Sequence, residues 1–298
     1  MKSNTDEILV VGSVLLRLTA LLALIGILAA AAIPAEKNEA VAPFRIIGNV
    51  YYVGGSNVTS FLIVTREGDI LIDGGYARTA PEIERSIRKL GFRLRDVKIL
   101  LNTHAHSDHA GGLAQLKRDT GAEFEAMAED APVLEHGGRG DFYFGNRLTF
   151  PVIKPDRILH DGDTVALGSV TLRAVLTPGH TKGCTTWTWT ERENGHAYHV
   201  VDVCSATVLS GYRLVDNPAY PEIAQDYRKT FERLKHLPCD VFLASHGSFF
   251  SMQEKLARFE HGEKPNPFID PEGYQRFVRY YEAQFQAALK KQERMTHR

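Results

Sequence analysis

The stretch of sequence that decides the fold runs from residue 97 to residue 109 and reads VKILLNTHAHSDH. Its first five residues are predominantly apolar, which predicts a short β-strand buried on both faces. The strand leads directly into His104, His106, Asp108 and His109. Zinc in proteins is bound by neutral imidazole nitrogen and by carboxylate oxygen. A His-x-His turn can aim two imidazoles at one point while the next Asp-His pair faces a second point, so this stretch predicts a metal site.

Two further histidines occupy similar settings later in the chain. His180 lies in Thr-Pro-Gly-His-Thr after a predicted strand, and His246 lies in Ala-Ser-His-Gly after another. Glycine beside each histidine permits close approach of the backbone to a crowded site. A lone histidine is usually an ordinary surface or core residue, but this many histidines at strand ends favour a metal centre.

Apolar runs of strand length alternate with amphipathic helices along most of the chain. In the first predicted helix, Ile83, Ile87 and Leu90 recur at the spacing of one helical face. This interleaving predicts an α/β or α+β layered fold in two halves of similar content, about 44–165 and 166–298. The predicted strands are 61–64, 70–72, 97–101, 165–167, 170–175, 185–190, 198–203 and 241–244, and the predicted helices are 81–90, 221–237 and 273–292.

The composition is that of an ordinary globular protein. Of 298 residues, 44% are hydrophobic and 24% are charged, and the formal net charge is -1. This near-neutral balance predicts neither a nucleic-acid partner nor attraction to a membrane surface. The length is sufficient for one large domain or two modest ones.

The N-terminus departs from that composition. Arg17 precedes an uncharged, alanine-rich run from Leu18 to Ala32. Such a pattern is typical of a secretory signal peptide, so we expect residues 1–35 to be removed and the mature protein to be periplasmic or secreted. The alternative is an uncleaved membrane anchor, although the run is shorter than the ~20 apolar residues that a spanning helix needs.

The histidine pattern resembles that of the metallo-β-lactamase superfamily, and further segments are similar to its subclass B3 β-lactamases. The resemblance implies a four-layer αββα sandwich, formed by 36–298 as a single domain, with a dinuclear zinc site at one edge. The histidines identify only the superfamily, whereas the last two segments are specific to the subclass. The segments are ILIDGG (70–75), NTHAH (102–106), DHAGG (108–112), TPGHT (177–181), GYRL (211–214) and DYR (226–228).

The resemblance implies two Zn²⁺ ions per chain, each held by three side chains. The two sets are His104, His106 and His180 for the first ion, and Asp108, His109 and His246 for the second. Asp73 ends a strand beneath the site and would hydrogen-bond a ligating histidine. Ser205 and Thr207 correspond loosely to hydroxyls that orient the substrate or a water in related enzymes.

The activity that the resemblance implies is hydrolysis of the β-lactam amide of penicillins, cephalosporins and carbapenems. A hydroxide bridging the two ions attacks the carbonyl, Asp108 positions it, and no covalent intermediate forms. The expected partner is this small-molecule substrate, with no nucleic acid, no membrane association after processing, and a monomeric chain. The alternatives are a thioesterase or lactonase of the same fold and a zinc-binding module with a degenerate site.

Residues 202–204 bear on those alternatives. Thioesterases and lactonases of the superfamily typically add a bridging aspartate here; Asp202 is the only candidate, and its flanking residues differ from the usual pattern. Cys204 could ligate the second ion, as a cysteine does in another subclass, but His109 already fills that place. We therefore expect Cys204 to pair with Cys184, because both flank the same two strands; free thiols are the alternative.

Residues 137–145 place three aromatic side chains among glycines. Two interpretations are equally supported by the sequence. The segment is either a mobile loop that covers bound substrate or a packed surface loop.

Overall fold

The computed structural model describes residues 38–296, so the predicted signal peptide lies outside the described residues. Two sheets of seven and five strands make up the centre of this part of the chain. The first sheet has the order β1 (Phe44–Ile47), β2 (Val50–Tyr52), β3 (Phe61–Val64), β4 (Asp69–Ile72), β5 (Val97–Leu101), β6 (Glu123–Met127), β7 (Arg157–Leu159). The second has the order β12 (Val241–Ala244), β11 (His196–Val203), β10 (Thr185–Glu193), β9 (Val170–Leu176), β8 (Thr164–Leu167).

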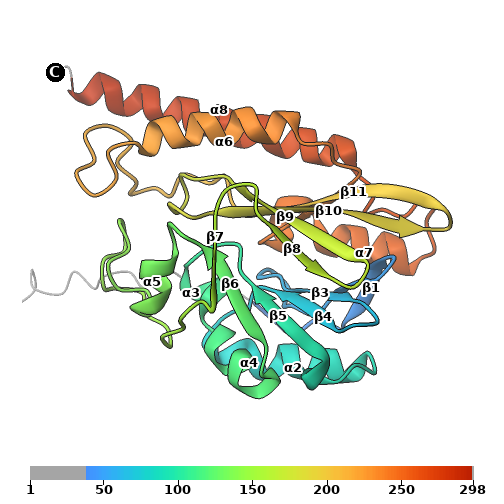
Figure 1. Cartoon of the computed structure of the whole chain (residues 1–298). Coiled ribbons are helices and arrows are strands. Elements are labelled where there is room, and N and C mark those ends of the chain that lie inside the picture. Colours follow the sequence, from blue (N-terminus) through green and yellow to red (C-terminus); the bar gives the residue numbers. More distant parts are fainter. Residues whose placement is uncertain (1–37, 297–298) are drawn as a thin grey trace, which may run out of the picture. The chain divides into compact units, whose positions relative to one another are not determined.

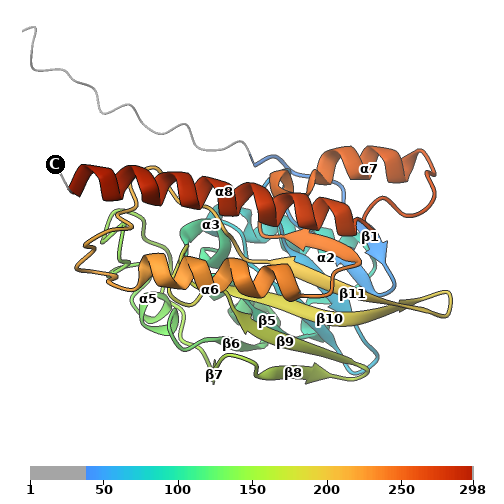
Figure 2. The same cartoon turned by 90° about the horizontal axis from the view of Figure 1, so that it is seen from above.

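Helices cover the outer face of each sheet, which gives four layers (Figure 1). Figure 2 shows α6 and α8 lying side by side over the second sheet. The αββα sandwich is therefore confirmed. The helices are η1 (Ala77–Thr79), α2 (Ala80–Lys89), η2 (Leu94–Asp96), α3 (Ser107–Ala110), α4 (Leu113–Thr120), α5 (Ala131–Glu135), α6 (Ile223–His236), η3 (Gly247–Phe250), α7 (Met252–Glu260) and α8 (Pro271–Thr296).

Strand β5 shows why the first sheet is buried on both faces. Successive side chains of a strand point to opposite faces. Leu100 packs in the same apolar cluster as Ile87 of α2, whereas Leu101 belongs to the larger cluster that contains Trp187 of β10. Lys98 is the exposed residue of this strand. Both faces of the sheet therefore lie against apolar layers.

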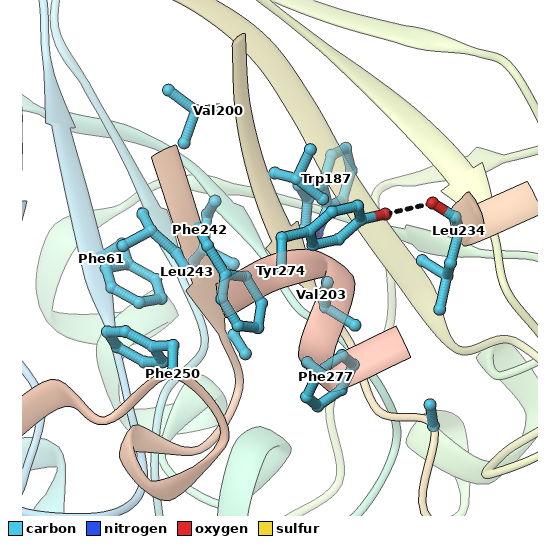
Figure 3. Close-up of a cluster of buried hydrophobic side chains, with 14 of the residues drawn as sticks. Phe61, Trp187, Val200, Val203, Leu234, Phe242, Leu243, Phe250, Tyr274 and Phe277 are labelled. Carbon is cyan, nitrogen blue, oxygen red and sulfur yellow. Dashed lines mark hydrogen bonds between the residues drawn. The ribbon is translucent and has the colours of Figure 1, made fainter. Parts of the chain in front are cut away.

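The larger core joins the two sheets to the C-terminal helix, as Figure 3 shows. Phe250 of η3 packs between Phe61 of β3 and Phe242 of β12, with ring centroids 6.5 and 6.1 Å away. Tyr274 of α8 donates a hydrogen bond of 2.6 Å to the carbonyl of Leu234 in α6. Each buried aromatic side chain of this kind contributes roughly 1.5–3 kcal/mol by removal from water.

The predicted strands and helices are all confirmed, with ends that differ by a few residues; α8 extends to Thr296 instead of 292. The sequence patterns do not predict β1, β2, β6, β7, α4 or α7. In β6 the reason is visible, because Glu125 interrupts the apolar pattern although it is buried. Its carboxylate is paired with Arg157 of β7 at 2.9 Å. Among residues 38–296, no helix has the length and apolar character needed to cross a membrane.

The carboxyl ends of six strands meet along one edge of the sandwich. β4, β5 and β6 are parallel neighbours in the first sheet. In the second sheet β9 and β11 both run antiparallel to β10, and β12 is parallel to β11. The two edges are joined where Trp187 donates its indole N–H to the carbonyl of Asn102 at 3.0 Å. The loops that leave these strands carry the predicted site residues.

Candidate metal centre

The first set of predicted ligands comes together at the strand ends. His104 and His106 follow β5, and His180 follows β9. Their ring centroids lie 4.8 to 4.9 Å apart. One nitrogen from each ring lies within 4.8 Å of the others, and all three side chains are buried. The three imidazoles therefore form a compact cluster, called the first cluster below.

The second set, called the second cluster, lies directly beside the first. His109 Nε2 is 3.2 Å from His246 Nε2 and 3.2 Å from Asp108 Oδ2. The distance from His246 Nε2 to the same carboxylate oxygen is 3.6 Å. His104 lies between the clusters, because its ring centroid is 4.2 Å from that of His109. All six predicted ligands are thus brought to one place.

Asp73 holds His109 of the second cluster in place through a hydrogen bond. Its Oδ2 accepts a hydrogen bond from His109 Nδ1 at 2.9 Å. The same carboxylate accepts the backbone N–H of Thr103 at 2.6 Å and its hydroxyl at 2.7 Å. Because Nδ1 of His109 is the donor, Nε2 is the nitrogen that faces Asp108 and His246.

The backbone at Asp73 is unusual and is held in place by glycines. Its φ of 64° is in the left-handed region, which non-glycine residues rarely adopt outside functional sites. The next residue, Gly74, donates its N–H to the carbonyl of His109 at 2.8 Å. A Cβ on Gly74 would lie 2.6 Å from the backbone nitrogen of Leu113. The Asp-Gly-Gly turn therefore packs directly against the short helix that carries the second cluster.

Ser205 and Thr207 lie beside the first cluster, after β11. His180 Nδ1 is 3.0 Å from the carbonyl oxygen of Thr207 and 3.0 Å from its hydroxyl. The Ser205 hydroxyl is in turn 3.1 Å from the Thr207 hydroxyl. Donation by Nδ1 to the carbonyl leaves Nε2 of His180 as the nitrogen available to a metal.

Cys184 and Cys204 form a disulfide in the structure, with their Cα atoms 5.8 Å apart. Both sulfur atoms lie near His104. A disulfide sulfur is not the thiolate that metals bind, so the geometry gives Cys204 no place as a ligand. Cys239 is the free cysteine of the described residues and is half-buried.

Comparison with known proteins agrees with this geometry. Residues 53–194 match the family described as the metallo-beta-lactamase superfamily. The native FEZ-1 metallo-beta-lactamase from Legionella gormanii is 43% identical, with 87% of this chain and 99% of that chain covered and a TM-score of 0.85. The chain belongs to the metallo-β-lactamase superfamily.

Other relatives of this chain are named for different activities. BJP-1 of Bradyrhizobium japonicum, a subclass B3 metallo-beta-lactamase, is 38% identical, with 87% of this chain and 97% of that one covered and a TM-score of 0.81. The human acyl-coenzyme A thioesterase MBLAC2 is 29% identical over 63% of this chain and 70% of its own length. A probable metallo-hydrolase of Burkholderia pseudomallei is 36% identical, but the match spans only 41% of its length.

The electrostatics of the site suit a metallo-β-lactamase fold that binds a cation. Burial, followed by repulsion from neighbouring histidines, lowers the pKa of His180 to about 3 and that of His246 to about 4. The same causes hold the pKa of His104 well below its usual range. These imidazoles are therefore neutral at pH 7, and neutral imidazole is the form that binds metal.

The Asp108–His109–Asp73 arrangement favours positive charge. Burial opposes charging of His109, but the carboxylates of Asp108 and Asp73 outweigh it and raise the pKa of His109 to about 10. Burial likewise opposes ionisation of Asp108, yet His109 and the other histidines hold the pKa of that carboxyl well below its usual range. The negative charge that stabilises a proton on His109 would equally stabilise a metal cation that displaces this proton, and imidazole nitrogen with an ionised carboxylate is a donor set that fits Zn²⁺. The residues present therefore fit the metal that the family implies.

Asp202 does not join either cluster. Its side chain is fully buried in β11, and neither carboxylate oxygen has a hydrogen-bond partner among residues 38–296. Burial, followed by repulsion from Asp73, raises the pKa of Asp202 well above its usual range. A buried carboxyl outside the ligand clusters is poorly placed to bridge two ions.

Asp130 is a site residue that the sequence patterns do not reveal. It is buried, and it accepts the N–H of Ala105 at 2.9 Å, the hydroxyl of Thr181 at 2.9 Å and the N–H of Gly183 at 2.7 Å. It therefore ties the loop of His104 and His106 to the loop of His180. Recognition of β6 as a strand would have marked Asp130 as a strand-end residue.

Asn57 is a second such residue, from the loop between β2 and β3. Its side-chain amide lies 3.3 Å from His246 Nδ1. The neighbouring Val58 pairs with His246 as an isolated β-bridge. The position of His246 thus depends on a contact between residues almost 190 positions apart in the sequence.

Proposed function

We propose that this chain is a zinc-dependent β-lactamase that hydrolyses the amide bond of β-lactam antibiotics with two Zn²⁺ ions. The observation that carries the proposal is the extent of the likeness to FEZ-1, 43% identity over 99% of a metallo-β-lactamase chain. The thioesterase likeness is weaker, at 29% over 70% of that protein. The clustering of all six predicted ligands supports the same conclusion.

The two clusters give each ion its own side chains. His104, His106 and His180 would hold one ion, while Asp108, His109 and His246 would hold the other. When bound, zinc would supply Lewis acidity towards a carbonyl oxygen and a water of lowered pKa. The protein's part is to place these groups, keep His104, His180 and His246 neutral, and orient the substrate.

Asp108 has a role in orientation beyond binding metal. Its side chain is partly exposed, whereas the histidine of the same short helix, His109, is fully buried. Because its pKa is held low, it is ionised at neutral pH and accepts hydrogen bonds. Its carboxylate would orient the attacking water towards the β-lactam carbonyl.

Aromatic rings flank the two clusters at opposite ends. The Phe144 ring centroid is 5.2 Å from that of His106, and the Phe249 ring centroid is 5.0 Å from that of His246. Substrate sites are typically lined by apolar and aromatic side chains around a few polar groups. We propose that these rings contact the apolar parts of the antibiotic on either side of the reacting amide.

No serine in this arrangement has the setting of a nucleophile. Ser205 is buried, and its hydroxyl contacts Thr207 instead of a base. We therefore expect hydrolysis without an acyl-enzyme, and we expect inhibitors that acylate a catalytic serine to have no effect.

A thioesterase is the second candidate, because of the likeness to the human acyl-coenzyme A thioesterase. The position of Asp202 argues against it. A bridging carboxylate would have to reach both ions, whereas Asp202 is buried in β11 and is in neither ligand cluster.

We further propose export to the periplasm or medium, with removal of residues 1–35, and a monomeric mature protein without a nucleic-acid or membrane partner. The disulfide between Cys184 and Cys204 supports an oxidising compartment.

The test is a substrate panel with the purified zinc-loaded protein. We expect hydrolysis of a chromogenic cephalosporin and a carbapenem, abolished by a chelator and restored by Zn²⁺. Preferential hydrolysis of an acyl-coenzyme A or acyl-glutathione, with the β-lactams untouched, would replace the proposal by the thioesterase. Zinc binding without turnover of any of these substrates would indicate a binding module.

A further inference from the structure

His106 has an acidic neighbour outside the first cluster. Its Nε2 is buried and has no hydrogen-bond partner within 3.5 Å among residues 38–296. The acidic group facing it is Asp141, whose Oδ2 lies 3.7 Å away. The side chains are 8% and 6% exposed, so little water separates the two groups. The electrostatic interaction of a carboxylate with a neighbouring N–H group is stronger where solvent screens it so little.

Asp141 also shapes the segment from which it comes, residues 137–145 between α5 and β7. Its other oxygen, Oδ1, accepts the backbone N–H of Tyr143 at 2.8 Å and that of Phe144 at 2.6 Å. Gly145 donates to the carbonyl of Asp141 at 3.0 Å, which closes the turn. One carboxylate therefore folds this segment with one oxygen and faces a predicted metal ligand with the other.

The same turn places aromatic rings against the first cluster. Phe144 packs edge-on to His106, with an interplanar angle of 80°. Tyr143 packs on Tyr212 with centroids 4.8 Å apart, and Tyr212 donates its hydroxyl to the carbonyl of His180 at 2.7 Å. The segment thus contacts His106 directly and His180 through Tyr212. The packed interpretation of this segment agrees with these contacts.

We propose that Asp141 is a positioning residue that couples residues 137–145 to metal binding at the first cluster. Its carboxylate faces His106 Nε2 and favours the tautomer that carries the proton on this nitrogen, which leaves Nδ1 as the nitrogen for the metal. Since coupling between two events is reciprocal, a metal on His106 stabilises the closed turn, and the closed turn strengthens metal binding. The inference rests on the metal centre of the proposed function but not on its substrate.

Asp141→Asn separates the two roles of this side chain. Its carbonyl oxygen can still accept both backbone N–H groups, so the turn is retained, while the charge facing His106 is lost. We expect the affinity for one of the two zinc ions to fall by roughly 10–100-fold, the usual effect of losing a hydrogen-bond partner of a ligand. The affinity for the other ion should stay as in the wild type. The measurement is competition for Zn²⁺ with a chelating dye.

Trypsin provides a second readout that needs no substrate. Arg139 and Arg147 are exposed near the two ends of the segment. The Arg147 guanidinium donates to the carbonyl of Tyr143 at 2.8 Å, so cleavage there requires the turn to open. In the wild type, Zn²⁺ should slow cleavage at both arginines. In Asp141→Asn a higher Zn²⁺ concentration should be needed to slow cleavage to the same extent.

Asp163→Asn is the matched control, because Asp163 also accepts a backbone N–H, that of His160, in a turn before β8. It should behave as the wild type in both assays. Wild-type affinity for both ions in Asp141→Asn, or cleavage at Arg139 and Arg147 that Zn²⁺ leaves unchanged, would overturn the inference. Because neither assay uses a β-lactam, a failure of the proposed activity is recognised separately.

Discussion

The two clusters of the metal centre are built in different ways. The second cluster has Asp108 and His109 adjacent in sequence, and carboxylates supply its support: Asp73 on one side of His109 and Asp108 on the other. The first cluster unites loops that are about 75 residues apart, and its histidines face a backbone carbonyl at His180 and the Asp141 carboxylate 3.7 Å from His106. Close carboxylate contacts on one imidazole therefore hold the second cluster, whereas contacts between several loops hold the first.

The two clusters should therefore lose metal affinity in response to different substitutions. Loss of the Asp73 carboxylate should weaken the second cluster selectively, because it removes the charged partner of His109. The first cluster should respond to changes in loops that hold no metal, such as those fixed by Asp130.

The largest effect is expected for His104→Ala, because His104 lies within ligand distance of members of both clusters. We expect loss of bound zinc and of β-lactam turnover by well over the ~10–100-fold that follows loss of an outer hydrogen-bond partner. Metal content and the rate with a chromogenic cephalosporin measure the two effects. Full turnover in this variant would refute the assignment of the site.

Asp73→Asn should affect one cluster and spare the other. His109 would lose the carboxylate that its Nδ1 contacts at 2.9 Å. We expect about a 10–100-fold weaker affinity for the second ion, with the first ion bound as in the wild type. A stepwise zinc titration measures both, and an equal loss at the two sites would show that the clusters are not independent.

Asp202→Val removes the buried carboxyl group of β11, and its effect should appear in the pH dependence of stability. The raised pKa of Asp202 means that the folded protein keeps a proton that the unfolded chain releases above about pH 4. Stability of the wild type should therefore decline, relative to the variant, as pH rises from about 4 towards that raised pKa. The difference should grow by at most ~1.4 kcal/mol per pH unit. Denaturant unfolding at pH 5 and pH 8 measures it, and parallel curves would contradict the account.

Thr207→Val should have the smallest effect. The hydroxyl is lost, but the carbonyl that accepts from His180 Nδ1 remains. We expect less than about a fivefold change in zinc affinity, below the ~1 kcal/mol of one net hydrogen bond. A larger loss in the same dye competition would mean that the hydroxyl, and not the carbonyl, orients His180.

The sequence predicts those parts of the molecule whose pattern is local. The apolar runs of β5 and β12 and the histidines that follow them are visible without tertiary information. β6 is hidden because Glu125 is charged in sequence and neutralised only by Arg157 in the fold. Asp130 and Asn57 are hidden for a similar reason, since their partners are distant in sequence. The order of the strands likewise depends on contacts that a one-dimensional pattern does not contain.

The most direct test of the central claim is a zinc titration of the metal-free protein, followed by hydrolysis of a chromogenic cephalosporin. The account predicts no turnover without metal and a rise that ends at two zinc ions per chain. It also predicts that the acyl-coenzyme A rate stays negligible throughout. Two bound zinc ions with no β-lactam hydrolysis, or undiminished hydrolysis in the absence of metal, would contradict it.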